Sequence, residues 1–484
     1  MRVLPYSFAS RFNVIFLEPE TLFVVEGVAW EVIEEARRAL KRPLNLSQVS
    51  LSKFESLLTA VYQKATSEVN QIIEHVSTGK ELSLLVEELP ENQDLLDLDE
   101  DAPIIKLINA ILSEAIKEGA SDIHLETFEA TLLVRFRIDG VLKDILSPNR
   151  KLAPLLVSRV KVMAKLDIAE HRVPQDGRIS LRVGSRGVDV RVSTMPSAHG
   201  ERVVLRILDK NLTQLDLQSL GMTEHIYRSF RQLLRKPHGI LLVTGPTGSG
   251  KSTTLYAGLQ ELDYGQKNIL TVEDPIEFNL EGIGQTQVNP KVDMTFSCGL
   301  RAILRQDPDV IMVGEIRDLG TAKVVGQASL TGHLVMSTLH SNTAVGAITR
   351  LRNMGMESFL ISSSLVGVLA QRLVRVLCAD CRQPYMANDL QKAYLENRKS
   401  GSLVLYAKKG CKACNFRGYR GRTGVHELLV LDEEVRRLIH KNASEQQIEQ
   451  YVRQSRPSIR RDGITKVENG ITSIEEVMRI TEDS

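Results

Sequence analysis

The chain has 484 residues, and 61 Lys and Arg side chains against 60 Asp and Glu give a formal net charge of +1. At roughly 100 to 200 residues per domain, this length predicts about three domains, while 43% hydrophobic and 25% charged residues argue against wholesale disorder or a fibrous repeat. The balanced charge provides no bulk positive field for nucleic acid, and no stretch is apolar enough to cross a membrane.

The first 80 residues carry little chemistry. Apolar side chains recur at helical spacing over Val32–Leu40 and Phe54–Tyr62, which predicts an α-rich module over residues 1–80. The opening lacks the features of a signal peptide, so we do not expect export. Residues 81–101 contain nine acidic residues, no basic residue and Pro90, so we expect a solvated acidic linker there, with an interaction tail as the alternative.

The apolar period then changes from helical to alternating. A helix is expected to begin at Pro103 and to end near Gly119. Alternating patterns predict strands at Leu132–Ile138, 178–183, 188–192 and 203–208, and Asp139-Gly140 is typical of a hairpin turn. These patterns predict an α+β domain over residues 102–218.

From Gly239 onward, short apolar strands alternate with helices. The expected strands span 240–244, 269–272, 310–313 and 334–338, and their continuous apolar character favours a largely parallel, buried sheet. We therefore expect an α/β catalytic domain over residues 219–484.

A P-loop pattern follows the first of these strands. Such a loop binds phosphates because its backbone N–H groups and the following helix N-terminus point at the ligand. Lys251 is expected to contact the β- and γ-phosphates of ATP, and Ser252 to bind Mg²⁺. The candidate nucleotide-binding residues are Gly245, Pro246, Thr247, Gly248, Ser249, Gly250, Lys251, Ser252 and Thr253.

Two groups of acids follow later strands. Glu315 ends an apolar strand in the Walker B form, which favours a role beside Mg²⁺ and water. Residues 271–277 place three carboxylates, including Glu273 and Glu277, after another strand. The alternative is that these acids cap helices.

Histidines and arginines are less specific signals. His333 and His340 flank one strand, and their spacing of seven places them at opposite ends, too far apart to bind one metal. Taken alone, each is interpreted as a hydrogen-bonded structural histidine, with a catalytic role as the alternative. Phosphoryl transfer needs guanidinium groups near the γ-phosphate, often from a neighbouring subunit, and most arginines otherwise form surface ion pairs. The candidates are Arg191, Arg206, Arg301 and Arg305.

Four cysteines form two Cys-x-x-Cys pairs separated by 29 residues. Cys378, Cys381, Cys411 and Cys414 could close a tetrahedral Zn²⁺ site, which would be structural because no ligand position stays open. A metal-free or redox pair is the alternative. Cys298 stands alone and is interpreted as an ordinary small side chain.

With these motifs in place, the sequence resembles the E-component ATPases of type II secretion, within the superfamily of secretion and type IV pilus ATPases. The resemblance covers nearly the whole chain. Its motifs, besides the P-loop, are Leu4–Ala9, Gly119–His124, Val173–Arg178, Glu273–Glu277, Leu304–Asp309, Gly314–Asp318, Leu330–His333, Thr338–His340 and Gly418–Arg422.

The resemblance implies a RecA-like P-loop core, a zinc-binding subdomain over residues 375–425, and nucleotide bound between two lobes of a homohexamer subunit. Glu277 would be the base that activates water, and Glu315 the Walker B acid. His333 and His340 would sense nucleotide, and the four candidate arginines would reach the phosphates.

The resemblance also implies a cytoplasmic protein attached peripherally to the inner membrane through partners. The module 1–80 would dock on the cytoplasmic domain of the inner-membrane secretion protein L, and an inner-membrane platform protein would be a further partner. The function implied is ATP hydrolysis that powers pseudopilus assembly. Two residues depart from the family pattern: Cys298 replaces a usual arginine, and Gly320 replaces a usual glutamate, which is expected to loosen a helix start.

Three other functions are alternatives. A type IV pilus assembly ATPase shares every catalytic motif and the zinc module, whereas pilus retraction ATPases lack the tetracysteine insert. A RecA-like nucleic-acid motor is disfavoured by the net charge, and we expect no nucleic-acid partner. A nonenzymatic scaffold would be expected to lack Glu277 or Glu315.

Overall fold

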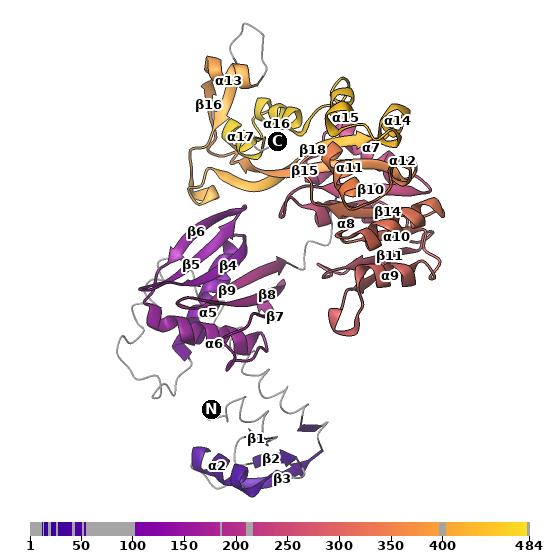
Figure 1. Cartoon of the computed structure of the whole chain (residues 1–484). Coiled ribbons are helices and arrows are strands. Elements are labelled where there is room, and N and C mark those ends of the chain that lie inside the picture. Colours follow the sequence, from indigo (N-terminus) through magenta and orange to yellow (C-terminus); the bar gives the residue numbers. More distant parts are fainter. Residues whose placement is uncertain are drawn as a thin grey trace. The chain divides into compact units, whose positions relative to one another are not determined.

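The computed structural model describes residues 12, 14–17, 21–25, 28–40, 44–50, 53–54, 102–183, 186–209, 216–395 and 403–481. The chain divides into two compact units, Met1–Asp209 and Lys210–Ser484 (Figure 1). The predicted acidic linker, residues 81–101, lies outside the described residues, as does the motif Leu4–Ala9.

The N-terminal module contains a small mixed sheet. Strand β1 (Val14–Leu17) is antiparallel to β2 (Thr21–Val25), and helix α2 (Trp30–Leu40) crosses over to β3 (Asn45–Val49), which is parallel to β2. Apolar residues from this module form one core. The helix predicted at 32–40 is confirmed, the sheet was not part of the α-rich prediction, and most of the predicted helix 54–62 lies outside the described residues.

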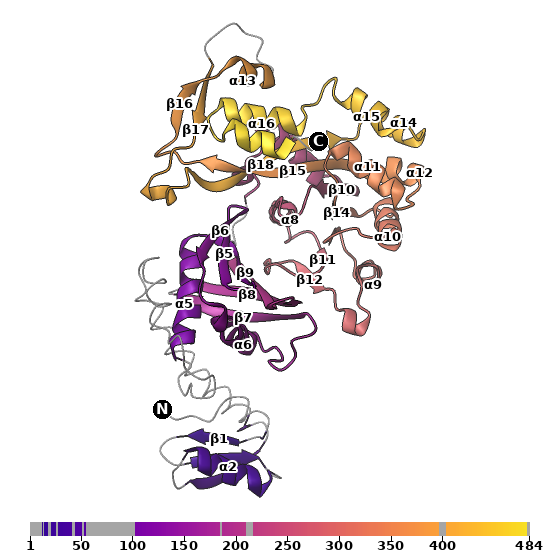
Figure 2. The same ribbon diagram turned by 60° about the vertical axis from the view of Figure 1, so that its left-hand side comes forward.

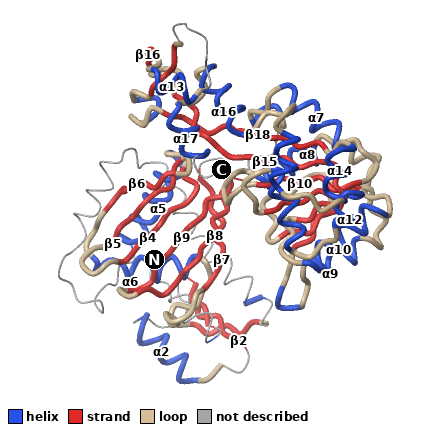
Figure 3. Tube along the Cα trace, turned by 45° about the horizontal axis from the view of Figure 1, so that its top comes forward, coloured by secondary structure: helices blue, strands red, loops and turns tan. Residues whose placement is uncertain are grey.

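The described residues between 102 and 209 contain a six-stranded antiparallel sheet with the order β6-β5-β4-β9-β8-β7 (Figure 3). Its strands are β4 (Ala120–Thr127), β5 (Leu132–Ile138), β6 (Val141–Leu146), β7 (Gln175–Val183), β8 (Arg186–Ser197) and β9 (Gly200–Asp209). Asp139 and Gly140 have positive φ angles of 49° and 84°, which confirms the predicted hairpin turn.

One face of this sheet is covered by helices α5 (Ala102–Lys117) and α6 (Ala153–Met163), the second of which follows a 3₁₀ turn at Arg150–Leu152. Alternate residues of β5 point into the core that these helices share with the sheet. The opposite face carries charged side chains, so the two faces follow the alternation expected for an antiparallel sheet.

The second unit is built on a seven-stranded sheet with the order β12-β11-β13-β14-β10-β15-β18. Only β18 runs antiparallel to its neighbour, β15. The strands are β10 (Gly239–Thr244), β11 (Ile269–Glu273), β12 (Gly284–Gln287), β13 (Val310–Val313), β14 (Leu334–Leu339), β15 (Leu365–Leu377) and β18 (Tyr419–Val430). The four strands expected from the sequence are therefore present and parallel to one another.

Helices cover both faces of this sheet. Two of them, α7 (Glu224–Leu234) and α8 (Lys251–Gln260), share a core with one face. The other face packs against α9 (Phe296–Ile303), α10 (Leu319–Leu330), α11 (Ala344–Asn353), α12 (Ser358–Ser364), α14 (Glu433–His440) and α15 (Glu445–Val452). Short 3₁₀ turns lie at Gln218–Leu220 and Pro290–Val292.

The chain between β15 and β18 forms an insert at the far end of this strand pair (Figure 2). It contains β16 (Gln383–Met386), α13 (Asp389–Tyr394), β17 (Val404–Ala407) and a 3₁₀ turn at Lys412–Cys414. Apolar residues of the insert pack against α16 (Ile459–Glu468) and α17 (Ile474–Thr481). No helix in the described part of the chain is long and apolar enough to cross a bilayer.

Candidate nucleotide site and metal centre

Four parallel strands end at the same edge of the second unit's sheet. The P-loop follows β10, Glu273 ends β11, Glu315 follows β13 and His340 follows β14. Backbone hydrogen bonds continue past the strand ends, because Gly314 N donates to Val272 O at 2.8 Å and Ile316 N to Thr338 O at 3.1 Å. This edge is where parallel α/β sheets bind their ligands.

The P-loop turns sharply from β10 into α8. Gly250, which precedes the helix, has a φ of 85°, so a residue with a side chain would be strained there. A Cβ atom on Gly248, whose φ is 76°, would meet no other atom within 4 Å, so the loop is open on that side. The buried Ser249 hydroxyl has no hydrogen-bond partner among the described residues.

A glutamine that the sequence analysis missed lies against this loop. Gln371 of β15 donates from Nε2 to Ser249 O at 2.6 Å, and its Oε1 accepts from Thr254 Oγ1 at 2.7 Å. All three residues are buried. The amide therefore links the end of the loop to the first turn of α8.

Lys251 is folded across the loop. Its ammonium group donates to Gly245 O at 2.8 Å and to Pro246 O at 3.1 Å. Burial lowers the pKa of Lys251, and the negative charge of Glu315 opposes that effect. The lysine and the Walker B acid therefore lie close enough to interact electrostatically.

Glu315 lies in a charged cluster, with 17% of its side chain exposed. Its carboxylate is paired with the Arg317 guanidinium, which is also 3.9 Å from Asp274, and lies 3.8 Å from His340 Nε2. Burial and the charge of Lys251 lower the pKa of His340 more than Glu315 raises it, which favours the neutral imidazole at pH 7. Arg317 belongs to the motif Gly314–Asp318, but the sequence analysis assigned no role to it.

Glu273 and Glu277 have different surroundings. Glu273 is 3% exposed and accepts hydrogen bonds from the Tyr256 hydroxyl, from Thr271 Oγ1 at 2.6 Å and from Gln285 Nε2 at 3.0 Å. The backbone N–H of Glu277 donates to the same Tyr256 hydroxyl at 3.2 Å. Glu273 is thus an internal anchor, whereas the side chain of Glu277 is partly exposed at the sheet edge.

His333, Arg301 and Arg305 lie at the other edge of the sheet. His333 precedes β14, and its Nδ1 is 2.9 Å from Ala328 O and 3.1 Å from Thr331 Oγ1. The two arginines lie at the end of α9 that leads into β13. Because six strand residues at roughly 3.3 Å each separate His333 from His340, His333 lies far from the strand end that carries the P-loop.

Arg191 and Arg206 belong to the first unit. They are directly paired between β8 and β9, and both lie on the sheet face opposite α5 and α6. Arg206 Nε donates to Asp122 Oδ1 at 2.9 Å, although most of the arginine side chain is exposed.

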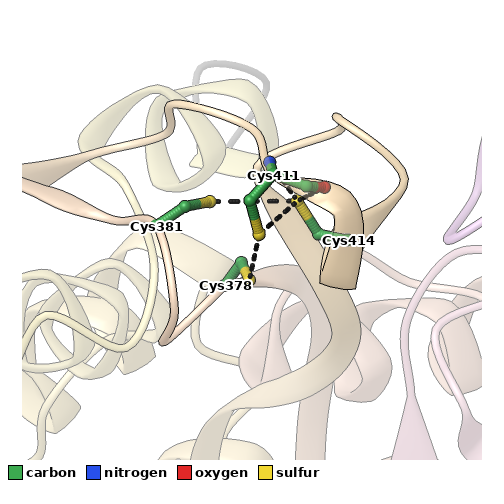
Figure 4. Close-up of side chains that lie close together, drawn as sticks. All are labelled: Cys378, Cys381, Cys411 and Cys414. Atoms are coloured by element: carbon green, nitrogen blue, oxygen red, sulfur yellow. Dashed lines mark hydrogen bonds between the residues drawn. The ribbon is translucent and has the colours of Figure 1, made fainter.

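The four predicted cysteines converge in the insert (Figure 4). Their sulfur atoms all lie within 4.8 Å of one another, and three of the separations are 3.8 to 3.9 Å. Tetrahedral Zn²⁺ with Zn–S bonds near 2.3 Å requires sulfurs about 3.8 Å apart. The donor set and its geometry therefore fit a structural zinc ion.

Backbone N–H groups point at these sulfur atoms. Gly410 N donates to Cys381 Sγ at 3.3 Å, and Cys411 N and Gly418 N each donate to Cys414 Sγ at 3.2 Å. Burial acts in the opposite direction, but these two N–H groups and the neighbouring thiols lower the pKa of Cys414 to about 6. The backbone thus favours the thiolate, the form that binds zinc, at Cys414. Burial acts the other way at two other cysteines, because it raises the pKa of Cys378 to about 11 and also raises the pKa of Cys381.

The parallel sheet with its P-loop, together with the acids at the strand ends, defines a P-loop nucleotide hydrolase. A family model described as "Type II/IV secretion system protein" matches residues 97–479. A second model, which describes an N-terminal domain of "GSPII protein E", matches residues 3–62.

Related proteins show more closely which family the chain belongs to. The type II secretion system ATPase E of Vibrio cholerae is 63% identical over 490 residues, which is 100% of this chain and 97% of the relative. The type II secretion system protein E of Aeromonas hydrophila is 60% identical, over 99% of this chain and 96% of the relative. The crystal structure of the pilus retraction motor PilT with bound ADP aligns with a TM-score of 0.51 at 27% identity, covering 77% of this chain and 96% of that chain. The chain belongs to the type II secretion ATPase E family.

Proposed function

We propose that the chain is a Mg²⁺-dependent ATP hydrolase that acts as a homohexamer and powers pseudopilus assembly in type II protein secretion. The observation that carries this proposal is the convergence of Lys251 and Glu315 at the carboxyl edge of the sheet. Identity of 63% to a type II secretion ATPase along the whole chain supports this function over type IV pilus assembly.

We assign the residues at the sheet edge separate roles in phosphate binding, metal binding and water activation. Lys251 would neutralise the β- and γ-phosphates, and the loop N–H groups would hold their oxygens. Ser252 and Glu315 would hold Mg²⁺, directly or through water. When bound, the metal ion would supply positive charge beside the phosphates. Glu277 would orient the attacking water and accept its proton, because its side chain is partly exposed at this edge whereas Glu273 is buried.

Residues away from this edge would act from another lobe or another subunit. Charge from a neighbouring lobe or chain is a common device in phosphoryl transfer, and it would give a role to arginines that do not follow the strand ends at this edge. His340 would respond to nucleotide through Glu315. The residues proposed to act across an interface are Arg191, Arg206, Arg301, Arg305 and His333.

The remaining regions would support this motor. The four cysteines would hold one structural Zn²⁺ within residues 375–425. We also propose the boundaries 1–80, 81–101, 102–218 and 219–484 for the docking module, the acidic linker, the α+β domain and the ATPase domain. The match of residues 3–62 to a domain family of their own supports a distinct docking module. That module would attach the motor to the cytoplasmic domain of secretion protein L at the inner membrane, beside the platform protein.

Two variants of the full chain test the nucleotide site. Lys251→Ala should lose both ATP binding and phosphate release, because it removes the cation that neutralises the phosphates. Glu277→Gln should still bind ATP but release phosphate about 10²- to 10⁴-fold more slowly, since it cannot accept the proton. Wild-type turnover in Lys251→Ala would refute the site, and wild-type turnover in Glu277→Gln would assign the base to another residue.

A further inference from the structure

Gln371 contacts the P-loop through its side chain. It lies in the middle of β15 and is 2% exposed. Its two amide atoms are used in opposite senses: Nε2 donates to the Ser249 carbonyl, and Oε1 accepts from the Thr254 hydroxyl. Because Thr254 N also donates to Gly250 O at 3.0 Å, the amide and the helix together fix the backbone of 249–254.

The backbone of Gln371 also limits the loop. Ala370 pairs with Thr244, the last residue of β10, so Gln371 comes directly after the point where the P-loop begins. A Cβ on Gly245 would lie 2.3 Å from Gln371 O, and a Cβ on Gly250 would lie 3.1 Å from Gln371 Nε2. One residue therefore touches both ends of the loop, and this close approach leaves no room for a side chain at Gly245.

We infer that Gln371 is a positioning residue for nucleotide: its amide holds the loop in the conformation whose N–H groups converge on the phosphates. This inference rests on the proposed function of the P-loop. Gln371 acts through Ser249 and Thr254 and does not itself contact the nucleotide. A loop held in this conformation before binding loses less conformational entropy when ATP binds.

The chemistry of the amide makes this role testable. A carboxylate at position 371 would place a charged oxygen against the Ser249 carbonyl oxygen, where the native Nε2 donates. A protonated carboxyl group can donate there again, and burial favours the protonated form. Gln371→Glu should therefore position the loop at low pH and fail to do so at high pH. Gln371→Met should fail at every pH, because it leaves both polar partners unsatisfied.

Other titratable groups on the flanking elements do not reproduce this pattern. His426 is paired with Gln371 across β15 and β18, and burial lowers its pKa to about 3. Lys251 begins α8 and is present in every variant, as is Glu315 beside it. The ratio of variant to wild type at each pH therefore isolates position 371.

The experiment measures the Kd of a fluorescent ATP analogue, and KM and kcat for ATP, at pH 6.0 and pH 8.5 on the full chain. Gln371→Glu should raise Kd about tenfold over wild type at pH 8.5 and less than about threefold at pH 6.0, the pattern of a hydrogen bond lost and regained. Gln371→Met should raise Kd about tenfold at both pH values, and in both variants KM should change more than kcat. The matched control, Gln454→Glu, adds the same charge at an exposed site and should behave as wild type.

Equal Kd ratios for Gln371→Glu at the two pH values, or a wild-type Kd for Gln371→Met, would overturn the inference. If either variant fails to fold, Thr254→Val removes only the bond to Oε1, and it should still raise Kd about threefold; a wild-type Kd would then reject the positioning role. Failure of the proposed function looks different, because wild type itself would neither bind nor hydrolyse ATP.

Discussion

Tyr256→Phe should destabilise the second unit and slow ATP turnover, although the phenol does not reach the P-loop through any described hydrogen bond. Tyr256 is 1% exposed. Its hydroxyl donates to buried Glu273 and accepts from the backbone N–H of Glu277. Removing one oxygen atom therefore takes a partner from a buried carboxylate and from the backbone of the proposed base at once.

The size of the expected destabilisation follows from these two hydrogen bonds. A hydrogen bond to a charged group contributes about 1.5 to 3 kcal/mol, and the ring that fills the core stays in place. We expect the free energy of unfolding to fall by about 2 kcal/mol, which for a domain of this size lowers the melting temperature by roughly 4 to 8 °C. Turnover should fall about tenfold because Glu277 loses its backbone anchor and a small misplacement is costly in catalysis.

The assay combines thermal melting with phosphate release at saturating ATP. Tyr264→Phe is the matched control, because it removes the same atom from a residue that is 52% exposed, and it should match wild type in both measurements. In a Glu273→Gln background, Tyr256→Phe should lower the melting temperature less than it does in wild type, since the carboxylate acceptor is gone. Equal melting temperatures and rates for Tyr256→Phe and Tyr264→Phe would refute this reasoning.

Four further outcomes are expected. Metal analysis should find about one Zn²⁺ per chain, because such sites contribute roughly 10 to 16 kcal/mol to local folding, and Cys378→Ser should lower both zinc content and melting temperature. Burial lowers the pKa of His426 to about 3, so between pH 6.5 and 3 the unfolded chain binds a proton that the folded chain does not. Stability should therefore fall by about 1.4 kcal/mol per pH unit as the pH drops, and His426→Gln should show a smaller loss of melting temperature between pH 7.5 and 5.5. Specific activity should rise with protein concentration, and Arg206→Ala should lower it at every concentration; a fully active monomer would contradict the interface role. A chain that starts at Ala102 should keep ATP binding but no longer associate with membranes that contain protein L, and retained association would place docking in the catalytic unit.

Local sequence patterns were sufficient to predict much of the fold of the second unit. The four apolar segments became parallel strands because they are short, buried on both faces and separated by helices. The P-loop and each Cys-x-x-Cys pair lie within a few adjacent residues, so the spacing of residue types was enough to locate them. The separation of seven between His333 and His340 likewise predicted that they flank one strand at opposite ends.

Contacts between distant residues could not be predicted in this way. Gln371 lies 122 residues from its partner Ser249 in the sequence, and an isolated glutamine in an apolar strand gives no signal of what it binds. The different surroundings of Glu273 and Glu277 depend on the hydroxyl of Tyr256, which sits on another element. The N-terminal sheet was missed because its strands are only four or five residues long, too short for a clear alternating pattern.

The most direct test of the central claim is Mg²⁺-dependent phosphate release by the full chain and its Glu315→Gln variant. The control is Glu433→Gln, which makes the same change at an exposed position on α14. If Glu315 stabilises charge in the transition state beside Lys251, the rate should fall by about 10² or more with ATP still bound, while the control keeps the wild-type rate. Equal rates for Glu315→Gln and wild type would contradict an ATP-hydrolysing site at this edge of the sheet.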